Sequence, residues 1–481
     1  MLKNKLMAHL SKVRLSLPKA KRYAEHIGQT ITNTDMPVAK WCLDYPSTIH
    51  EPHYENGSRV VQGWVLLKPT MSQALSQVRI VCDLQPTFEL CFPLNVNRPD
   101  VLQNMLPDAS GNDQQLMCGF RFLVPLNLTL LRLSLELNDK RWLLKQLNLE
   151  PNGLCSSAMK VLVGNEGWFF LDNDTNFSVD QHTGNIRLTD KGIADWSEYA
   201  QVIRQGYHGL QSPVMFLVAP TKESVMSEYH PKRVARQSIL QPVFNLLPSE
   251  QLIYPVSELH NTLGDGAFYK TDTHWTHQGA SLVSALLAKR LGLPANKVDD
   301  LLTQDRYVSR EITGDLGNKF NPNISSQSLF LASFQFRKWV VYDNGLPNFG
   351  RVIVTHYEDA LEDSTCLIFG SSSSYSMLNY LCRFFKHLVF IHTAGSIDQT
   401  LVDSVSPTYL VAQTNARFMI RPPEANYLLS SAIAQKQSNL DEVGLEHQSK
   451  NRNLAGINLI EKLGLLPWHQ HISVFDEKPH N

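Results

Sequence analysis

The chain has 481 residues, of which 43% are hydrophobic and 19% are charged, and these proportions argue against a disordered protein. Its 44 lysine and arginine residues nearly balance 45 aspartate and glutamate residues, so no net charge favours nucleic acid, and no nucleic-acid-binding motif occurs. Because single hydrophobic cores stop growing well below this length, we expect at least two domains.

The first 37 residues form a basic segment. Seven lysine and arginine residues precede the first acidic residue, Glu25, yet the segment has no apolar stretch of signal-peptide length. We therefore expect a cytoplasmic protein without a transmembrane segment. Two interpretations of the segment stay open. It is either a frayed terminus or a peripheral contact with the inner membrane surface, made through Leu2, Leu6, Leu10 and Leu17.

Residues 38–151 contain short apolar or alternating runs separated by turn residues, from RVVQGWVLL to KRWLLKQLNL. Runs of this length and spacing predict an all-β sandwich. The region has no catalytic cluster, so its aromatic residues either belong to the core or serve a glycan-binding or positioning role. In the second case an exposed aromatic side chain such as Trp64 would stack on a sugar.

After Pro151 strands alternate with helices. The apolar runs PVMFLVAP, QLIYPV, STCLIFG, HLVFIHT and PTYLVAQ are separated by helical patterns at 193–205, 231–246, 277–291 and 375–385, while 301–350 is loop-rich and 436–453 is polar. This alternation predicts an α/β domain with a parallel sheet flanked by helices, and its active site should lie at the carboxyl ends of the strands. The predicted divisions are a basic segment (1–37), a β-sandwich (38–151), an α/β catalytic domain (152–435), and a polar linker with a C-terminal helix (436–481).

The stretch KTDTHWTHQG, residues 270–279, places Asp272 and His274 two apart, immediately before the predicted helix. In an extended segment this spacing puts both side chains on one side, so the carboxylate can orient the imidazole as in half of a catalytic triad. A helix cap is the plainer interpretation, because Asp272, Thr273 and Thr276 are all common N-cap residues.

A metal site is a further alternative for the same stretch. Asp272, His274 and His277 could ligate a divalent cation, with His469 or His471 as an additional ligand, and the protein would then be a metal-dependent hydrolase. No acidic residue stands at the spacing of a metalloprotease motif, so we predict no metal.

The stretch CLIFGSSSSYSM, residues 366–377, is an apolar strand that ends in glycine, followed by serines and the start of a helix. α/β enzymes present a nucleophile at such a strand tip, and the backbone N–H groups of the helix start can stabilise an oxyanion. Together with Asp272 and His274, the serines complete the side-chain types of a triad. Composition leaves open which of Ser371 to Ser374 attacks.

These stretches carry a family resemblance. YKTDTHWTHQGA resembles the DxHW signature of the alginate O-acetyltransferase family of SGNH-like proteins, the AlgJ and AlgX type, and FGSSSSYSM resembles its nucleophile block. Three more fragments resemble the family in the same order over residues 161–423: VGNEGWFFL, LVAPTKESVMSEYHP and SPTYLVAQTNARFMIRPP. The resemblance implies an SGNH-hydrolase-like α/β fold, with Ser372 as nucleophile, His274 as general base and Asp272 as the residue that orients it.

The chain departs from the family pattern at two places. Ser371 precedes the nucleophile where aspartate or threonine is usual, and Asn415, Ala416 and Arg417 stand where glutamate and arginine are usual. The predicted substrate-binding residues are Trp275, Arg417, Lys270 and Ser371, and Lys222 and Asp315 are further candidates for shaping a site for an anionic glycan or donor.

The resemblance implies an O-acetyltransferase that moves an acetyl group through a Ser-His-Asp acyl-enzyme onto hydroxyls of a bacterial surface polysaccharide, such as a capsule or exopolysaccharide. The expected partners are this polysaccharide and an acetyl donor, either acetyl-CoA or a membrane acyltransferase relay, with no bound cofactor. The alternatives are a carbohydrate acetylesterase, the metal-dependent hydrolase, and an inactive glycan-binding protein.

Overall fold

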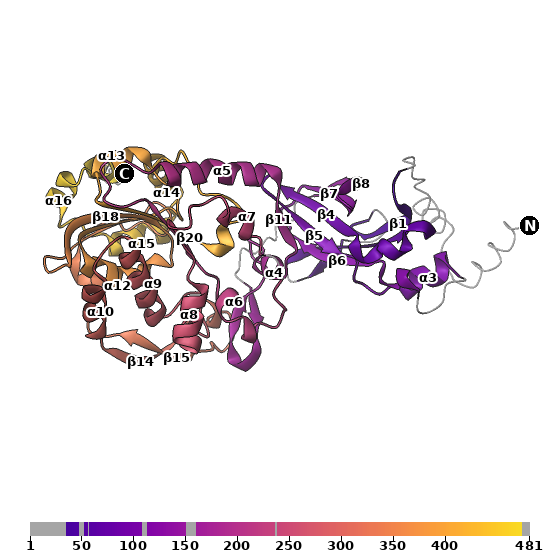
Figure 1. Ribbon diagram of the computed structural model, residues 1–481, viewed down its shortest axis with the longest axis horizontal. Coiled ribbons are helices and arrows are strands. Elements are labelled where there is room, and N and C mark those ends of the chain that lie inside the picture. The colour runs from indigo at the N-terminus through magenta and orange to yellow at the C-terminus, as the bar shows by residue number, and fades with distance from the viewer. Residues whose placement is uncertain are drawn as a thin grey trace, which may run out of the picture. The chain divides into compact units, whose positions relative to one another are not determined.

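The computed structural model describes residues 35–47, 52–55, 57–107, 113–150, 160–235 and 238–473. The predicted membrane contact of the basic segment lies outside the described residues. The chain divides into two compact units, residues 1–158 and 159–481 (Figure 1). None of the described helices is both long and apolar enough to cross a membrane.

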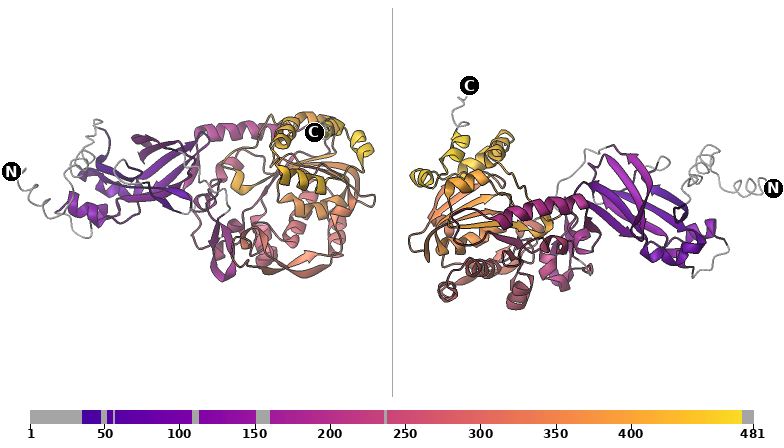
Figure 2. Two further views of the ribbon diagram at one scale, coloured as in Figure 1. Left: turned by 180° about the vertical axis from the view of Figure 1, so that it is seen from behind. Right: turned by 45° about the horizontal axis from the view of Figure 1, so that its top comes forward.

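The first unit consists of two antiparallel sheets, as expected of a strand-rich region (Figure 2). Phe92 and Phe122, one from each sheet, stack with ring centroids 4.3 Å apart. Trp64 is buried beside Leu66 and Cys118, so the sugar-stacking hypothesis is wrong for this side chain. One sheet comprises β1 (Val38–Tyr45), β2 (Tyr54–Glu55), β3 (Ser58–Leu67) and β6 (Gly119–Val124), the other has β4 (Arg79–Gln85), β5 (Phe88–Pro93), β7 (Leu130–Leu137) and β8 (Lys140–Asn148), and a helix, α3 (Pro99–Met105), follows β5.

The second unit is built on a seven-stranded sheet of order β13-β12-β20-β18-β19-β17-β16. Five strands are parallel: β13 (Leu252–Ile253), β12 (Met215–Ala219), β20 (Tyr409–Asn415), β18 (Glu362–Gly370) and β19 (Phe385–His392). The prediction of a parallel sheet is therefore confirmed for these strands. It is wrong for β17 (Val352–His356), which runs antiparallel to both of its neighbours, β19 and the edge strand β16 (Val340–Asp343), because the loop between β16 and β17 is too short for a crossover.

Helices cover both faces of this sheet, which explains why its strands are apolar without alternation. In β12, Met215 and Leu217 pack with α9 and α12 on one face, whereas Phe216 and Val218 pack with α5 and α13 on the other. The first face carries α8 (Val256–Leu263), α9 (His277–Arg290) and α12 (Ser374–Phe384), and the second carries α5 (Asp190–Gln205), α13 (Gln399–Val405), α14 (Leu429–Ser438), α16 (Ile457–Lys462) and α17 (Leu466–Ser473).

Two sequence-based assignments in this unit need correction. The predicted helix at 231–246 is reduced to α7 (Gln241–Phe244), because Pro242 has no N–H to continue the backbone hydrogen bonding of a helix that begins earlier. The loop-rich region 301–350 contains a hairpin of β14 (Tyr307–Ile312) and β15 (Ser326–Leu331), whose largely exposed residues give only a weak apolar pattern. Shorter elements between residues 161 and 317 are the hairpin β9 (Val161–Val163) and β10 (Phe169–Leu171), α4 (Ser178–His182), β11 (Ile186–Leu188), α6 (Lys222–Val225), α10 (Ala295–Thr303) and α11 (Gly314–Gly317).

The polar segment 436–453, predicted to be a linker, is mostly helical. It contains the end of α14 and all of α15 (Glu442–Asn451). Asp441 caps α15 by accepting a hydrogen bond from the amide of Gly444, and buried Gln448 donates to the carbonyl of Asn344. Because α15 is held by single polar contacts of this kind, its sequence has no apolar periodicity from which a helix could be predicted. The terminal helix predicted after it is present as α16.

Candidate active site

The serine turn between β18 and α12 distinguishes its four hydroxyls, all of which the structure describes. Ser371, Ser373 and Ser374 are buried, and Ser372 is the one that is partly exposed. A Cβ at Gly370 would lie 2.4 Å from Ser374 Oγ, so the tight packing of the turn requires glycine at the end of the strand. The turn therefore exposes one serine at the carboxyl edge of the sheet.

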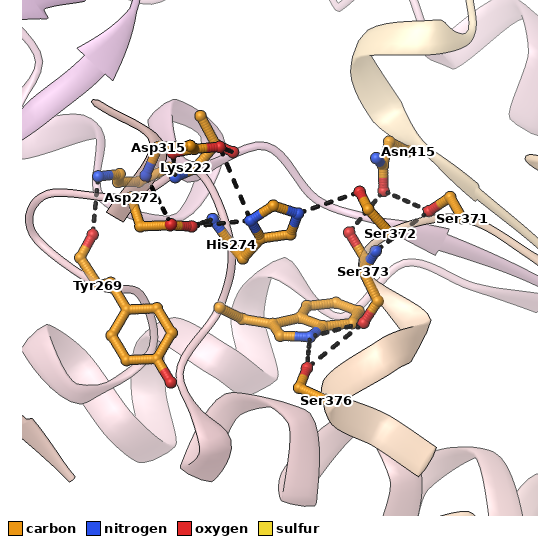
Figure 3. Close-up of polar contacts among 12 residues, drawn as sticks. Lys222, Tyr269, Asp272, His274, Asp315, Ser371, Ser372, Ser373, Ser376 and Asn415 are labelled. Atoms are coloured by element: carbon orange, nitrogen blue, oxygen red, sulfur yellow. Dashed lines mark hydrogen bonds and ion pairs between the residues drawn. The ribbon is translucent and has the colours of Figure 1, made fainter. Parts of the chain in front are cut away.

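Strand β20 holds the other three hydroxyls. Ser371 and Ser374 both donate to Gln413 Oε1, at 2.9 and 2.7 Å. Ser373 donates to Asn415 Oδ1 at 2.8 Å (Figure 3). The enclosed and bonded hydroxyl of Ser371 is placed as a structural group rather than as a substrate ligand. The sequence did not predict the role of Gln413. It stands in an apolar strand, and no local pattern indicates that its side-chain amide accepts from two serines about 40 residues away.

Asp272, His274 and Ser372 lie in one chain of hydrogen bonds (Figure 3). His274 Nδ1 is 2.7 Å from Asp272 Oδ1, and His274 Nε2 is 3.0 Å from Ser372 Oγ. The backbone amide of His274 also donates to Asp272 Oδ1, at 2.8 Å. With its proton on Nδ1, the imidazole presents an acceptor to the serine, which is the arrangement of a general base.

A second carboxylate, Asp315, fixes the loop that carries this pair. It accepts hydrogen bonds from the amide and hydroxyl of Thr273, and its own amide donates to Asp272 Oδ2 at 2.9 Å. The preceding Gly314 has φ +70°, and a Cβ there would lie 2.5 Å from Asp272 Cβ, so the close approach of α11 requires glycine. Asp315 Oδ2 is 3.8 Å from His274 Nδ1.

The two carboxylates control the ionisation of His274. Burial alone lowers the pKa of the imidazole, but the hydrogen bond and charge of Asp272, with the charge of Asp315, outweigh it and raise the pKa above its usual value. Burial raises the pKa of Asp272, and the hydrogen bond and charge of His274 overcome this, so the net pKa is lowered. An imidazolium at His274 would thus be stabilised on the Nδ1 side.

Lys222 anchors the same loop from α6. Its ammonium group is buried and donates to the carbonyls of Tyr269 and Lys270, at 2.8 and 3.0 Å. Burial lowers the pKa of Lys222 to about 7, although the charges of Asp272 and other nearby carboxylates oppose this shift. The Nζ of Lys270 itself lies 5.4 Å from the centroid of the Trp168 ring.

Trp275 and Thr276 complete the framework behind the dyad. Buried Trp275 donates from Nε1 to the carbonyl of Ser373 and to Ser376 Oγ, at 3.1 and 3.0 Å, and so ties the His274 loop to the serine turn (Figure 3). Thr276 caps α9 by accepting from the amide of Gly279 at 3.0 Å. The predicted cap is therefore present, and it coexists with the Asp-His pair instead of replacing it.

A cavity opens beside the triad. It is lined by His274, Trp275, Ser373, Asn415 and Arg417, and by Leu171, Ser178, Pro220, Thr221, Lys222, Glu223, Phe268 and Thr273. Of the predicted substrate-binding residues, Trp275 and Arg417 thus reach the cavity, whereas Lys270 and Ser371 do not line it. Glu223 escaped sequence reasoning because it stands in a short helix with no motif of its own.

The metal-site alternative is only partly assembled. Within the described residues, one group has donor atoms close enough for a metal ion, and it consists of Asp272, His274 and Asp315. His277 is not in this group, because its ring packs against Phe330. His469 hydrogen-bonds to Tyr342 in the core on the other face of the sheet, and the side chain of His471 lies outside the described residues. The donor atoms of the group are already joined by hydrogen bonds, as in a proton relay.

The part of the chain that carries Asp272 and His274 is similar to a known protein family. Residues 161–336 match the family model described as the SGNH hydrolase-like domain of the acetyltransferase AlgX. The second unit is therefore SGNH hydrolase-like over this range. The predicted family resemblance is thereby confirmed over a range that includes Asp272 and His274, while Ser372 lies beyond it. No match was found among curated proteins.

Several solved structures resemble the chain. PatB1 of Bacillus cereus aligns with a TM-score of 0.39 and 11% identity, covering 55% of this chain and 98% of that one. The O-acetyltransferase domain of AlgJ from Pseudomonas putida gives 0.32 and 16%, covering 58% and 99%. AlgX of Pseudomonas aeruginosa gives 0.28 and 11%, covering 55% and 67%.

Proposed function

We propose that the protein is an O-acetyltransferase that transfers an acetyl group through Ser372 onto a hydroxyl of a bacterial polysaccharide. The observation that carries the proposal is the continuous line from Asp272 Oδ1 through both ring nitrogens of His274 to Ser372 Oγ, with steps of 2.7 and 3.0 Å. The domain match to an acetyltransferase family supports the acetyl group as the acyl unit that is moved.

In the first half-reaction, Ser372 Oγ attacks the acetyl carbonyl carbon while His274 Nε2 takes the hydroxyl proton. The tetrahedral intermediate collapses by breaking the bond to the donor, and His274 returns the proton to the leaving oxygen or sulfur. In the second, a sugar hydroxyl attacks the acetyl-serine and passes its proton to His274, which then reprotonates Ser372 Oγ. Asp272 stays ionised throughout and holds the imidazolium.

Two donors are available for the oxyanion of each intermediate. Among the described residues, none accepts a hydrogen bond from the backbone amide of Ser372 or from Asn415 Nδ2, whereas Asn415 Oδ1 is fixed by Ser371 and Ser373. Asn415 lines the cavity, so we assign its Nδ2 and the Ser372 amide as the donors to the oxyanion.

The acetyl donor and the acceptor are assigned by class. Acetyl-CoA serves as donor if the protein works in the cytoplasm, and a membrane acyltransferase supplies the acetyl group if it works across the inner membrane. Hydrolysis of the same acyl-enzyme by water would make the protein a carbohydrate acetylesterase, which the same assay distinguishes.

The experiment compares wild type with Ser372→Ala on an acetyl ester and on bacterial oligosaccharides, with mass gain of an acetyl group as the readout of transfer. Ser309→Ala, a change of an exposed serine on β14, is the matched control. We expect loss of both activities in Ser372→Ala alone and no effect of a chelator. Equal activity of Ser372→Ala and wild type would overturn the assignment, and ester loss without mass gain on any glycan would establish the esterase.

A further inference from the structure

Two histidines face each other across strands β17 and β19. His356 is the last residue of β17, and its partner in the antiparallel register is His387. The amide of Tyr357 donates to the carbonyl of Lys386 at 3.0 Å, so the adjoining His356–His387 pair is of the non-hydrogen-bonded kind, in which side chains lie closest. The two rings stack with their centroids 4.9 Å apart. Both imidazoles are therefore held together on one face of the sheet.

The two Nδ1 atoms of this pair lie 3.3 Å apart. In a tetrahedral site with metal–nitrogen bonds of about 2.0 to 2.1 Å, two imidazole nitrogens on one ion lie about 3.3 to 3.4 Å apart. The separation between His356 and His387 therefore matches that of two ligands of one metal ion, and little backbone movement is needed to chelate it. Without an ion, one Nδ1 donates a hydrogen bond to the other.

A carboxylate orients the first of these rings from behind. Glu358 Oε2 lies 3.2 Å from His356 Nε2, the nitrogen that points away from His387. An acceptor at this position holds the ring proton on Nε2, so the Nδ1 of the neutral ring keeps a free lone pair. Histidines that bind metals in proteins almost always donate their other N–H to a carboxylate or carbonyl oxygen in this way. Glu358 thus supplies a second feature of a metal site, independent of the distance between the nitrogens.

The charges around the pair also favour a cation. Lys386 Nζ lies 2.8 Å from Glu358 Oε1 and 3.5 Å from Asp363 Oδ1, so two carboxylates outweigh one ammonium group beside the rings. Burial lowers the pKa of His387, and the charges of His356 and Lys386 lower it further, against the opposing charges of Asp363 and Glu358. Metal binding requires neutral imidazole, and the surroundings of His387 favour that form.

Another histidine pair in the same unit lacks this arrangement. The ring centroids of His182 and His230 are 4.1 Å apart, yet His182 Nε2 and His230 Nδ1 are each 3.0 Å from the carbonyl oxygen of Lys232. These nitrogens are therefore directed at the backbone, whereas the Nδ1 atoms of His356 and His387 face each other. Proximity of two rings alone does not make a chelating pair, and the direction of the nitrogens distinguishes the two cases.

We propose that His356 and His387 chelate a divalent transition metal ion through their Nδ1 atoms, with Glu358 holding the ring of His356. Imidazole ligands suit Zn²⁺, Ni²⁺ and Cu²⁺. The pair supplies two ligands, so water fills the remaining positions and the ion exchanges with solvent. This inference is independent of the proposed acetyl transfer, and it stands or falls by itself.

The site is remote from the serine turn, so its ion acts on the fold and not on the reaction. His387 pairs with Thr365 of β18, and five further residues of this strand lead to Gly370, a length of about 17 Å. An ion bound there joins the end of β17 to β19. Because the unfolded chain does not hold the two rings together, binding stabilises the folded state by mass action.

The experiment measures Zn²⁺ binding to the full chain by calorimetry after treatment with a chelator and dialysis. Wild type is compared with the double variant His356→Gln/His387→Gln and with Glu358→Gln. The matched control is His208→Gln, which changes an exposed histidine in the loop after α5. Any other site, such as the group of Asp272, remains in every variant and is thereby subtracted. Melting curves and hydrolysis of 4-nitrophenyl acetate report whether each variant is folded.

We expect one Zn²⁺ ion per wild-type chain at this site, an affinity at least about 100-fold lower in the double variant, and one about 10- to 100-fold lower in Glu358→Gln. His208→Gln should bind as wild type does. Zn²⁺ should raise the thermal midpoint of wild type and leave that of the double variant unchanged. With Cu²⁺, electron paramagnetic resonance should show two nitrogen ligands in wild type and one in His387→Gln.

Two results overturn the proposal. One is equal Zn²⁺ affinity in wild type and the double variant, and the other is the absence of binding of Zn²⁺, Ni²⁺ and Cu²⁺ to wild type. If the double variant fails to fold, Glu358→Gln decides, because this side chain is exposed and its replacement does not disturb the core. Unchanged affinity in that variant would then reduce the pair to a hydrogen bond between two strands.

Discussion

The two sides of the His274 imidazole differ in charge. Nδ1 faces Asp272 Oδ1 at 2.7 Å and Asp315 Oδ2 at 3.8 Å, whereas Nε2 faces the Ser372 hydroxyl, with Asn415 and Arg417 beyond it in the cavity wall. Both carboxylates that contact the imidazole therefore lie on its Nδ1 side, whereas the cavity wall holds Asn415 and Arg417 together with the buried carboxyl of Glu223. In the proposed mechanism this difference would give proton transfer a direction, because an imidazolium would be stabilised on one side and an oxyanion on the other.

Removing the imidazole of His274, which connects Asp272 to Ser372, should have the largest effect on activity. His274→Ala should lower kcat/KM for an acetyl ester by about 10⁴-fold or more, since the serine loses its base. The side chain is partly exposed, so the thermal midpoint should stay close to that of wild type. Steady-state kinetics and a melting curve on the same preparation check this. A small kinetic loss in a well-folded variant would remove His274 from the reaction.

Neutralising the Nδ1 side should come next. Asp272→Asn keeps the shape but loses the charge and favours the wrong tautomer, so we expect a fall in kcat of about 10²- to 10⁴-fold. The pKa of His274 should fall as well, because the raising contribution of Asp272 is lost. A ring-proton NMR titration of the variant measures that pKa, and an unchanged value would show that the carboxylate acts only as a scaffold.

On the Nε2 side, Asn415→Ala removes one of the two oxyanion donors. We expect kcat to fall about 10²- to 10³-fold with little change in KM, because the lost bond forms only in the transition state. The change also removes the acceptor of Ser373, while Ser371 keeps its bond to Gln413, so Asn415→Asp, which retains an acceptor for Ser373, is the informative companion. If Asn415→Asp retained wild-type kcat, Asn415 would be a structural residue.

The residues on the two sides of the His274 imidazole also differ in how well the sequence predicts them. Asp272 and His274 stand two residues apart in a local motif, so the Nδ1 pair could be proposed from spacing alone. Composition left four candidates in the serine run, and the family resemblance implied Ser372. In the structure Gln413 and Asn415, from a neighbouring strand, hold the hydroxyls of the other three. Such long-range hydrogen bonds carry no periodic signal.

The fold shows the same division between local and long-range information. Apolar runs such as PVMFLVAP were sufficient to predict β12 and its neighbours, because both faces of these strands are buried. Helix α15 and the β14–β15 hairpin were missed, since each is held by a few polar contacts or exposes most of its residues.

The smallest expected effect concerns the outer carboxylate. Base catalysis requires neutral His274, so activity should rise with pH through a half-point above the usual histidine pKa of about 6.5. Asp315→Asn removes one raising charge and should move this half-point to lower pH, by about one unit or less. The pH profile of kcat/KM in the two proteins tests this, and a shift to higher pH would contradict the electrostatic account.

The most direct measurement concerns Ser372 itself. The protein is mixed with 4-nitrophenyl acetate, quenched in acid, digested, and the peptides are read by mass spectrometry. The account predicts one acetyl group on Ser372, its disappearance when an acceptor oligosaccharide is added, and no adduct in His274→Ala. An acetyl group on Ser371, Ser373 or Ser374, or turnover without any adduct on this turn, would contradict it.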